Sequence, residues 1–248
     1  MAEGRVNVAF VCGGKYHDMD YARAEILRAL LETPHLRTRV FENYGNLDEI
    51  CAADCLLTYT VDVLPDEEGA QRLHDFVAGG RRWFALHGTN SVLRYVKGKG
   101  WDAPRVAPLF MQTLGSQFVA HPPIAPYDVE VTAPDHPLVR DIAAFSADDE
   151  LYLSELHPPI EVLLHTRFSG TTPGFVEADW TGSEIRPVLY LKKVGAGEVL
   201  YFTLGHARSR YDMQPLMAEY PNEDRGSWKQ PAFHTILRRG LAWMATRP

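Results

Sequence analysis

The sequence predicts an α/β protein whose doubly wound, mostly parallel sheet carries an antiparallel extension. In the first ninety residues, short apolar segments typical of buried parallel strands alternate with segments of helical periodicity. This alternation implies right-handed crossovers between parallel strands. Nearer the C-terminus, two apolar segments flank the glycine-rich turn at 195–197, which makes that pair of strands antiparallel and places it at the side of the parallel sheet.

The expected elements of the first part follow in chain order. Strands are predicted at 8–12, 39–41, 55–59 and 83–86, and helices at 21–31, 47–53 and 65–77. The first helix has apolar residues three and four positions apart, and Asp18 or Asp20 can cap its N-terminus. The helix at 65–77 has Pro65 near its start and acidic residues in its first turn, where the helix dipole favours them.

After residue 90 the pattern loosens. Strands are predicted at 127–132, 160–165, 187–192 and 198–204, and a closing helix at 231–243. Residues 91–115 carry glycines and prolines and an apolar stretch, and no element is predicted there. Asp148 and Asp149 are interpreted as a solvated acidic turn or a helix N-terminus. Because no repeat or linker interrupts the chain, residues 1–248 are expected to form a single domain.

Composition and charge exclude several classes of function. The net charge is −7, and no cluster of lysines and arginines is present, so nucleic acid is not an expected partner. No segment approaches the roughly 18 apolar residues of a membrane span, and no signal peptide is visible, which together predict a cytoplasmic protein. Gly13-Gly14 lacks the third glycine of a dinucleotide fingerprint, so no nucleotide cofactor is expected. A homodimer is expected only because two-fold assemblies are common.

Four of the ten histidines stand at the ends of predicted elements. Within the stretch 81–90, the strand at 83–86 is closed by Gly88, a residue that tolerates positive φ, and this places His87 at the carboxyl edge of the sheet. His17 follows the first strand, His121 follows the segment 117–120, and His206 follows the last strand. Because ligands of open α/β sheets bind at this edge, we expect the four imidazoles to converge on one pocket.

The chemistry of this pocket has two interpretations. Imidazoles with a carboxylate such as Glu150 or Asp18 suit a divalent metal, namely Zn, Mn or Fe. The same groups suit acid–base catalysis without a metal, and no pair of histidines one helical turn apart favours the metal. A single histidine at a strand end is more often a structural hydrogen-bonding residue. The shared topological position of all four is what favours a functional pocket.

Short motifs in a fixed order resemble the ThuA-like (trehalose utilisation) family. They are Gly13-Gly14 with Tyr16-His17-Asp18, Ala85-Leu86-His87-Gly88, Gly115-Ser116-Gln117-Phe118 before His121-Pro122, His136-Pro137-Leu138, Asp149-Glu150-Leu151-Tyr152, Gly195-Ala196-Gly197-Glu198-Val199 and Leu204-Gly205-His206. The resemblance spans nearly the whole chain.

That family is similar in fold to the class I glutamine amidotransferases, which implies a flavodoxin-like sheet. In the amidotransferases a strained turn after a central strand carries a catalytic cysteine, whereas here His87 holds that position. His206 stands where the amidotransferase histidine would be, but Arg208 replaces the glutamate two residues later. Imidazole cannot replace a thiolate in amide hydrolysis by the same route, so the resemblance argues against glutaminase activity.

The resemblance also implies a role in carbohydrate metabolism, with a sugar or keto-sugar derivative as the small-molecule partner. A metal or an imidazolium would polarise a carbonyl while a histidine or Glu150 removes an adjacent proton, with Tyr152 as a hydrogen-bond donor. Such chemistry serves an isomerase, a lyase or a hydrolase. The rivals are a metal-free hydrolase using the same histidines and a non-catalytic sugar-binding or regulatory protein.

The residues expected to contact the substrate lie near these histidines or are aromatic. Contacts are expected from Tyr16, Asp18, Thr89, Asn90 and Arg208. Aromatic residues that could stack on a sugar ring are Tyr16, Trp83, Trp101, Tyr152 and Trp180.

Overall fold

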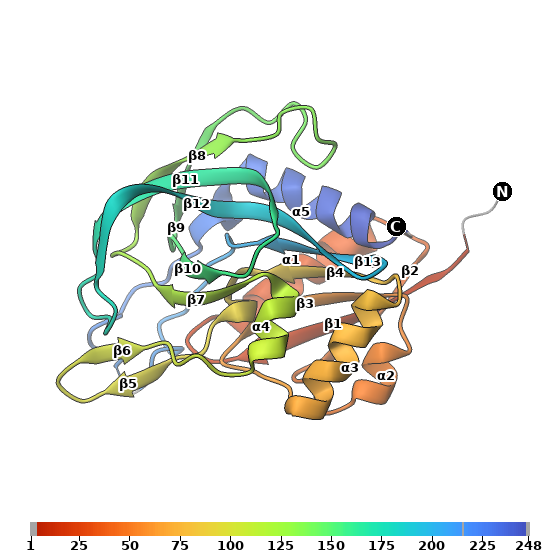
Figure 1. The fold of residues 1–248 in the computed structure, drawn as a ribbon, viewed down its shortest axis with the longest axis horizontal. Helices are drawn as coiled ribbons and strands as arrows, with labels where there is room; N and C mark the ends of the chain where they lie inside the picture. The colour runs from red at the N-terminus through yellow and green to blue at the C-terminus, as the bar shows by residue number, and fades with distance from the viewer. Residues whose placement is uncertain (1–3, 215, 247–248) are drawn as a thin grey trace.

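A nine-stranded sheet runs through the computed structural model, which describes residues 4–214 and 216–246 (Figure 1). Its strand order is β2-β1-β3-β4-β13-β12-β11-β8-β9. The first five strands in this order are mutually parallel: β1 (Val6–Gly14), β2 (Leu36–Phe41), β3 (Cys55–Val61), β4 (Arg82–Leu86) and β13 (Gly197–Phe202). The other four continue it antiparallel: β12 (Asp179–Val194), β11 (Glu161–Thr171), β8 (Ala125–Val131) and β9 (Phe145–Asp149).

Helices cover both faces of the parallel half (Figure 1). On one face, α1 (Met19–Leu31) packs against β1 and α5 (Pro231–Met244) against β4, and both helices share a core with Val8 and Phe10 of β1. On the other face, α2 (Leu47–Cys51), α3 (Glu67–Ala78) and α4 (Pro108–Leu114) form a second core that includes Ala9 and Val11. Since successive residues of β1 point to opposite faces and both faces are buried, the strand is apolar throughout.

Two small two-stranded antiparallel sheets and two single 3₁₀ turns complete the fold. They are β5 (Arg94–Val96) with β6 (Gly100–Asp102), β7 (Ser116–Ala120) with β10 (Leu153–Leu156), η1 (His87–Asn90) and η2 (Gly226–Lys229). The β5–β6 hairpin projects beyond the end of the main sheet (Figure 1). Within the described ranges, no helix has the length and apolar character needed to cross a membrane.

The predicted fold class is confirmed, including the parallel half, the antiparallel extension and the turn at 195–197 that joins β12 to β13. All seven elements expected before residue 90 are present, and Asp18 caps α1 by accepting a hydrogen bond from the amide of Tyr21. The strands predicted at 160–165 and 187–192 are longer than expected. The helices and strands not anticipated are α4, β5, β6, β7, β9 and β10.

The prediction of a solvated turn at 148–149 is wrong for Asp149. This residue ends β9 and is 1% exposed, whereas the neighbouring Asp148 is exposed. The physical reason is the two-residue period of the strand, which places Ala147 and Asp149 on the buried face and Asp148 on the solvent face.

Candidate metal centre and active site

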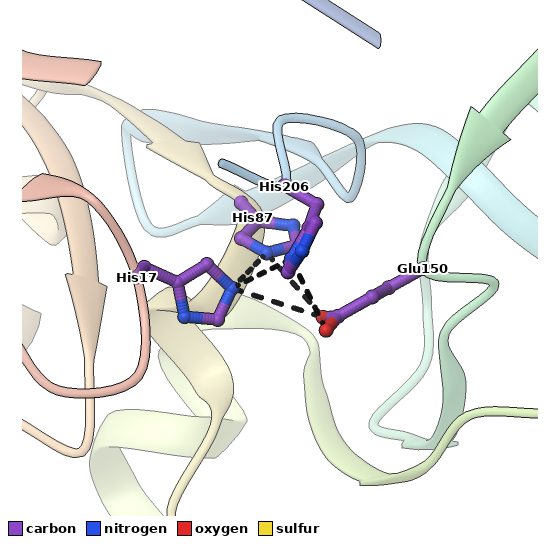
Figure 2. Close-up of side chains that lie close together, drawn as sticks. All are labelled: His17, His87, Glu150 and His206. Atoms are coloured by element: carbon purple, nitrogen blue, oxygen red, sulfur yellow. Dashed lines mark hydrogen bonds and ion pairs between the residues drawn. The ribbon is translucent and has the colours of Figure 1, made fainter. Parts of the chain in front are cut away.

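The turns after β1, β4 and β13 bring three histidines together at the carboxyl edge of the parallel sheet. His17 lies between β1 and α1, His87 begins η1 directly after β4, and His206 lies in the loop after β13. Glu150 reaches the same point from the end of β9 on the antiparallel side. Of the four histidines expected to converge here, the structure brings His17, His87 and His206 together with Glu150 (Figure 2).

The turn that presents His87 is strained at the histidine itself. His87 has φ 48°, in the left-handed region that side chains rarely adopt. Gly88 was expected to supply the positive φ, but its role is different. A Cβ at Gly88 would lie 2.3 Å from Val61 Cγ2 and 2.9 Å from the Thr60 carbonyl oxygen, so glycine is required there for close approach to β3.

The four side chains point toward one another at short distances (Figure 2). His17 Nε2 lies 2.8 Å from His87 Nε2 and 3.1 Å from His206 Nδ1. The Glu150 carboxylate lies 3.1 Å from His206 Nδ1, 3.5 Å from His87 Nε2 and 3.8 Å from His17 Nε2. One atom from each of the four residues can be chosen so that all lie within 4.8 Å of one another.

These separations fit the coordination shell of a divalent transition metal. Bonds of about 2.0–2.2 Å from a metal to nitrogen or oxygen place neighbouring ligands roughly 2.8–3.6 Å apart in octahedral or tetrahedral geometry. Three imidazoles with one carboxylate are a donor set suited to Zn, Mn or Fe. The cluster can therefore hold such an ion without rearrangement of its elements.

Neighbouring groups fix how two of the imidazoles face the cluster. His87 Nδ1 lies 2.8 Å from the carbonyl oxygen of Thr203, which can only accept, so Nδ1 carries the proton and Nε2 presents a lone pair to the cluster. On the far side of His206, Nε2 lies 3.7 Å from Asp224 Oδ2 and has no closer hydrogen-bond partner among the described residues. A proton on that nitrogen leaves Nδ1 free to bind a metal.

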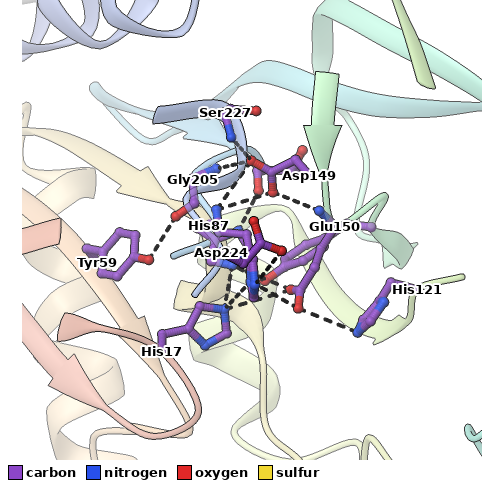
Figure 3. A network of polar contacts seen from close by, with 12 residues as sticks. His17, Tyr59, His87, His121, Asp149, Glu150, Gly205, Asp224 and Ser227 are labelled. Carbon is purple, nitrogen blue, oxygen red and sulfur yellow. Dashed lines mark hydrogen bonds and ion pairs between the residues drawn. The ribbon is translucent and has the colours of Figure 1, made fainter. Parts of the chain in front are cut away.

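Asp149 holds the segments that carry the ligands (Figure 3). Its carboxylate accepts hydrogen bonds from the backbone amides of Glu150, Gly205, His206 and Ser227, at 2.8–3.3 Å. One buried side chain thus joins the end of β9, the loop after β13 and the turn η2. Neither Asp149 nor Asp224 was anticipated from the sequence, although the alternation of β9 would have indicated Asp149.

The charges of the cluster perturb its titrating groups. Burial acts to raise the pKa of Glu150, but His206, His121 and His17 hold it well below the usual value, so the group is a carboxylate. Burial acts to lower the pKa of His206, but Glu150, Asp149 and Asp224 raise it above the ordinary value. Burial and the nearby His17 lower the pKa of His87 well below normal. His87 is therefore neutral, as a metal ligand must be.

A cavity of about 550 Å³ opens above the cluster. His17, Glu150 and His206 form part of its lining, and His87 lies beneath them with no exposed surface. Aromatic side chains form much of the wall: Tyr16, Tyr95, Trp101, Phe118, Tyr152, Phe175 and Tyr220. The rings of Tyr16 and Tyr95 each meet Trp101 edge-on, with centroids 5.4 Å apart. This volume and apolar character are typical of a site for a small organic ligand.

Of the other residues predicted to belong to the site, some line the cavity and others do not. Tyr16, Trp101, Tyr152, His121 and Arg208 line the cavity. His121 lies outside the four-residue cluster, with Nε2 3.6 Å from Glu150 Oε1. The Tyr152 hydroxyl lies 3.3 Å from His87 Nε2.

Other predicted contact residues are occupied elsewhere. Asp18 caps α1 and pairs with Arg225 at 3.0 Å. Thr89 is buried and donates to the carbonyl of Leu86, and Asn90 donates to Ser116, so both brace the turn and do not line the cavity.

Two of the aromatic residues expected to stack on a sugar also lie away from the cavity lining. Trp83 is buried on the α3 side of the sheet, where its indole N–H donates to Thr58. Trp180 stacks with Arg186.

Comparisons with known proteins agree with this fold. A family model described as ThuA, trehalose utilisation, matches residues 7–219. No curated protein matches the chain. Over 98% of its length the chain is similar to a protein described as ThuA-like from Bacteroides uniformis, at 14% identity, TM-score 0.68 and 93% coverage of that protein. A protein described as ThuA-like from Parabacteroides merdae gives 15% identity and TM-score 0.61, with 98% and 90% coverage.

A part of a larger protein also shares the fold. A β-galactosidase from Rahnella sp. R3 matches 97% of this chain with 31% of its own length, at 15% identity and TM-score 0.57. At these identities the structural likenesses show the mixed α/β fold alone.

Proposed function

The chain belongs to the ThuA, or trehalose-utilisation, family, and from that premise we propose that it is a metal-dependent enzyme acting on a sugar or keto-sugar derivative. The observation that carries the proposal is the meeting of His17, His87, His206 and Glu150 at the floor of an aromatic-walled cavity. Four ligand groups from four separate segments, three of them imidazoles, seldom meet at such distances for structural reasons alone.

A divalent cation held by these four residues would act as a Lewis acid on a carbonyl or hydroxyl oxygen of the substrate. The protein's own contribution is the orientation of the ligands. Thr203 sets the tautomer of His87, and Asp149 accepts hydrogen bonds from the backbone amides of Glu150 and His206. Such supporting contacts keep a site in the geometry needed for catalysis.

Two further groups supply proton chemistry in this proposal. Burial, together with Glu150, raises the pKa of Tyr152 well above normal, so its hydroxyl stays protonated and can donate a hydrogen bond to a substrate oxygen. His121 lies at the cavity wall next to Glu150, where it can accept a proton taken from carbon beside a carbonyl. Enolisation of a keto-sugar in this way serves an isomerase or a lyase.

The carbohydrate class is supported by the cavity wall and by the family. Trp101 and Tyr16 present aromatic surface of the kind on which the apolar face of a sugar ring packs. The printed name of the family refers to trehalose utilisation, and a β-galactosidase contains a region of similar fold.

Metal content tests the proposal first. We expect protein purified without a histidine tag or chelator to carry about one equivalent of Zn, Mn or Fe by elemental analysis, and His87→Ala and His206→Ala to lose it. His157→Ala is the matched control, because the hydrogen bonds at residue 157 use its backbone and its imidazole is outside the cluster. Wild-type protein that neither contains nor takes up metal would exclude the metal site.

Enolisation is tested separately. The metal-loaded protein should exchange the proton beside the carbonyl of a 3-keto-sugar for solvent deuterium, detected by NMR, and His121→Ala should slow this exchange. Binding of the keto-sugar without exchange or turnover would contradict an enzymatic role and would favour a sugar-binding protein.

A further inference from the structure

Arg208 lines the cavity, and among the described lining residues it is the only arginine or lysine. We propose that its guanidinium binds a carboxylate on the substrate, so that the ligand of this site is a sugar acid. The inference rests on the proposed function because it takes the cavity to be the substrate site.

The side chain of Arg208 has unused hydrogen-bonding capacity. Its Nε is buried and has no hydrogen-bond partner among the described residues. The guanidinium lies 5.0 Å from the centre of the Tyr220 ring, which also lines the cavity, and within the described ranges it forms no ion pair with a carboxylate. A buried N–H without a partner is costly, and an acceptor on a ligand would remove that cost.

The neighbouring cations behave differently. Lys15 and Arg94 both pair with Asp62, at 2.8 and 2.7 Å, and Arg225 pairs with Asp18 at 3.0 Å. Each of these charges is matched by an acid of the protein. The Arg208 guanidinium lies over the ring of Tyr220, and no carboxylate of the described residues pairs with it. It is therefore available to a charged ligand.

The backbone holds Arg208 in place beside the cluster. Its amide donates to the carbonyl of Asp224 and its carbonyl accepts from the amide of Asp224, both at 2.8 Å. Arg225 Nη1 also donates to the Arg208 carbonyl, at 3.3 Å. Asp224 faces His206 at the same time. His206 and Arg208 thus lie two residues apart in a loop that Asp224 braces, and both line the cavity, so a substrate can meet both.

The charge and shape of one guanidinium favour a carboxylate. Its parallel N–H groups match the two oxygens of a carboxylate. A phosphate is usually bound by several cations or backbone amides, and no second lysine or arginine lines the described cavity. Glu150 is matched by its histidines, so it does not cancel the charge of Arg208, and this locally positive part of the cavity attracts an anion.

Calorimetric titration of the metal-loaded protein with glucuronate, glucose and glucose 6-phosphate tests the inference. We expect wild-type protein to bind glucuronate roughly tenfold or more tighter than glucose. Arg208→Gln should abolish this preference by weakening glucuronate binding alone, and Arg208→Lys should restore only part of it. Arg210→Gln is the matched control, since it removes an equal charge from an exposed residue outside the cavity lining.

Equal binding of glucuronate and glucose by wild-type protein would overturn the inference. So would a preference for glucuronate that survives in Arg208→Gln, because the metal would then be holding the carboxylate. Tighter binding of glucose 6-phosphate than of glucuronate would also overturn it. Failure of this inference can be told apart from failure of the proposed function. If protein that takes up no metal still prefers glucuronate, and the preference depends on Arg208, this inference holds and the proposed metal-dependent activity is excluded.

Discussion

Asp149 accepts hydrogen bonds from four backbone amides at the junction of β9, the loop after β13 and η2. In Asp149→Asn one oxygen becomes an NH₂ group that faces N–H donors. We expect the free energy of unfolding to fall by ~2–4 kcal/mol and the metal content to fall with it. Denaturant unfolding and elemental analysis measure the two effects. Asp148→Asn is the control, since that neighbour is exposed, and equal losses in both variants would contradict the assignment.

At the residue scale, the sequence predicted the candidate metal ligands better than the acidic residues that hydrogen-bond or pair with them. His17, His87 and His206 were identifiable because each follows a strand of the parallel sheet, and such ends meet at one edge. Asp149 was missed because consecutive acids suggest a surface turn, and only the pairing of β9 buries one of them. Asp224 lies in an irregular loop, where no periodicity indicates which residue faces inward.

At the scale of elements, α5 packs so closely on β4 that Gly240 has no room for a side chain. A Cβ there would lie 2.4 Å from the ring of Phe84, which is fully buried. Gly240→Ala should therefore lower the unfolding free energy by about 1–3 kcal/mol, although alanine favours helix. Thermal or denaturant unfolding measures it. In a Phe84→Leu background, Gly240→Ala should lower the unfolding free energy by less. An equal loss in both backgrounds would show that contact with Phe84 is not the cause.

The elements that the sequence predicted best are those with strong periodicity. The strands and helices before residue 90 have clear apolar patterns, because helices cover both faces of the parallel sheet and the contacting residues are therefore apolar. α4 was missed although Pro108 begins it and Gly115, in the left-handed region, ends it, since both also punctuate loops. The ends of β11 and β12 have exposed residues, so apolar patterning did not reveal their length.

At the scale of the whole molecule, metal binding should stabilise the fold in a pH-dependent manner. The raised pKa of His206 means that a proton competes with the metal at this ligand, so metal affinity falls as the pH drops through that pKa, by up to about tenfold per unit. The rise in melting temperature on adding Zn should therefore be larger at pH 8 than at pH 6. Calorimetry with and without a chelator measures it, and a Zn effect of the same size in His87→Ala would contradict the site.

His87 also has a consequence for how this protein evolves. A histidine held at φ 48° costs the folded state about 1 kcal/mol relative to glycine, and a turn between a strand and a 3₁₀ helix needs no side chain at that position. The backbone conformation alone would favour glycine there. A lineage that keeps the imidazole keeps a strained turn in exchange for its chemistry, whereas in one that lost the activity this strain would no longer be offset by function.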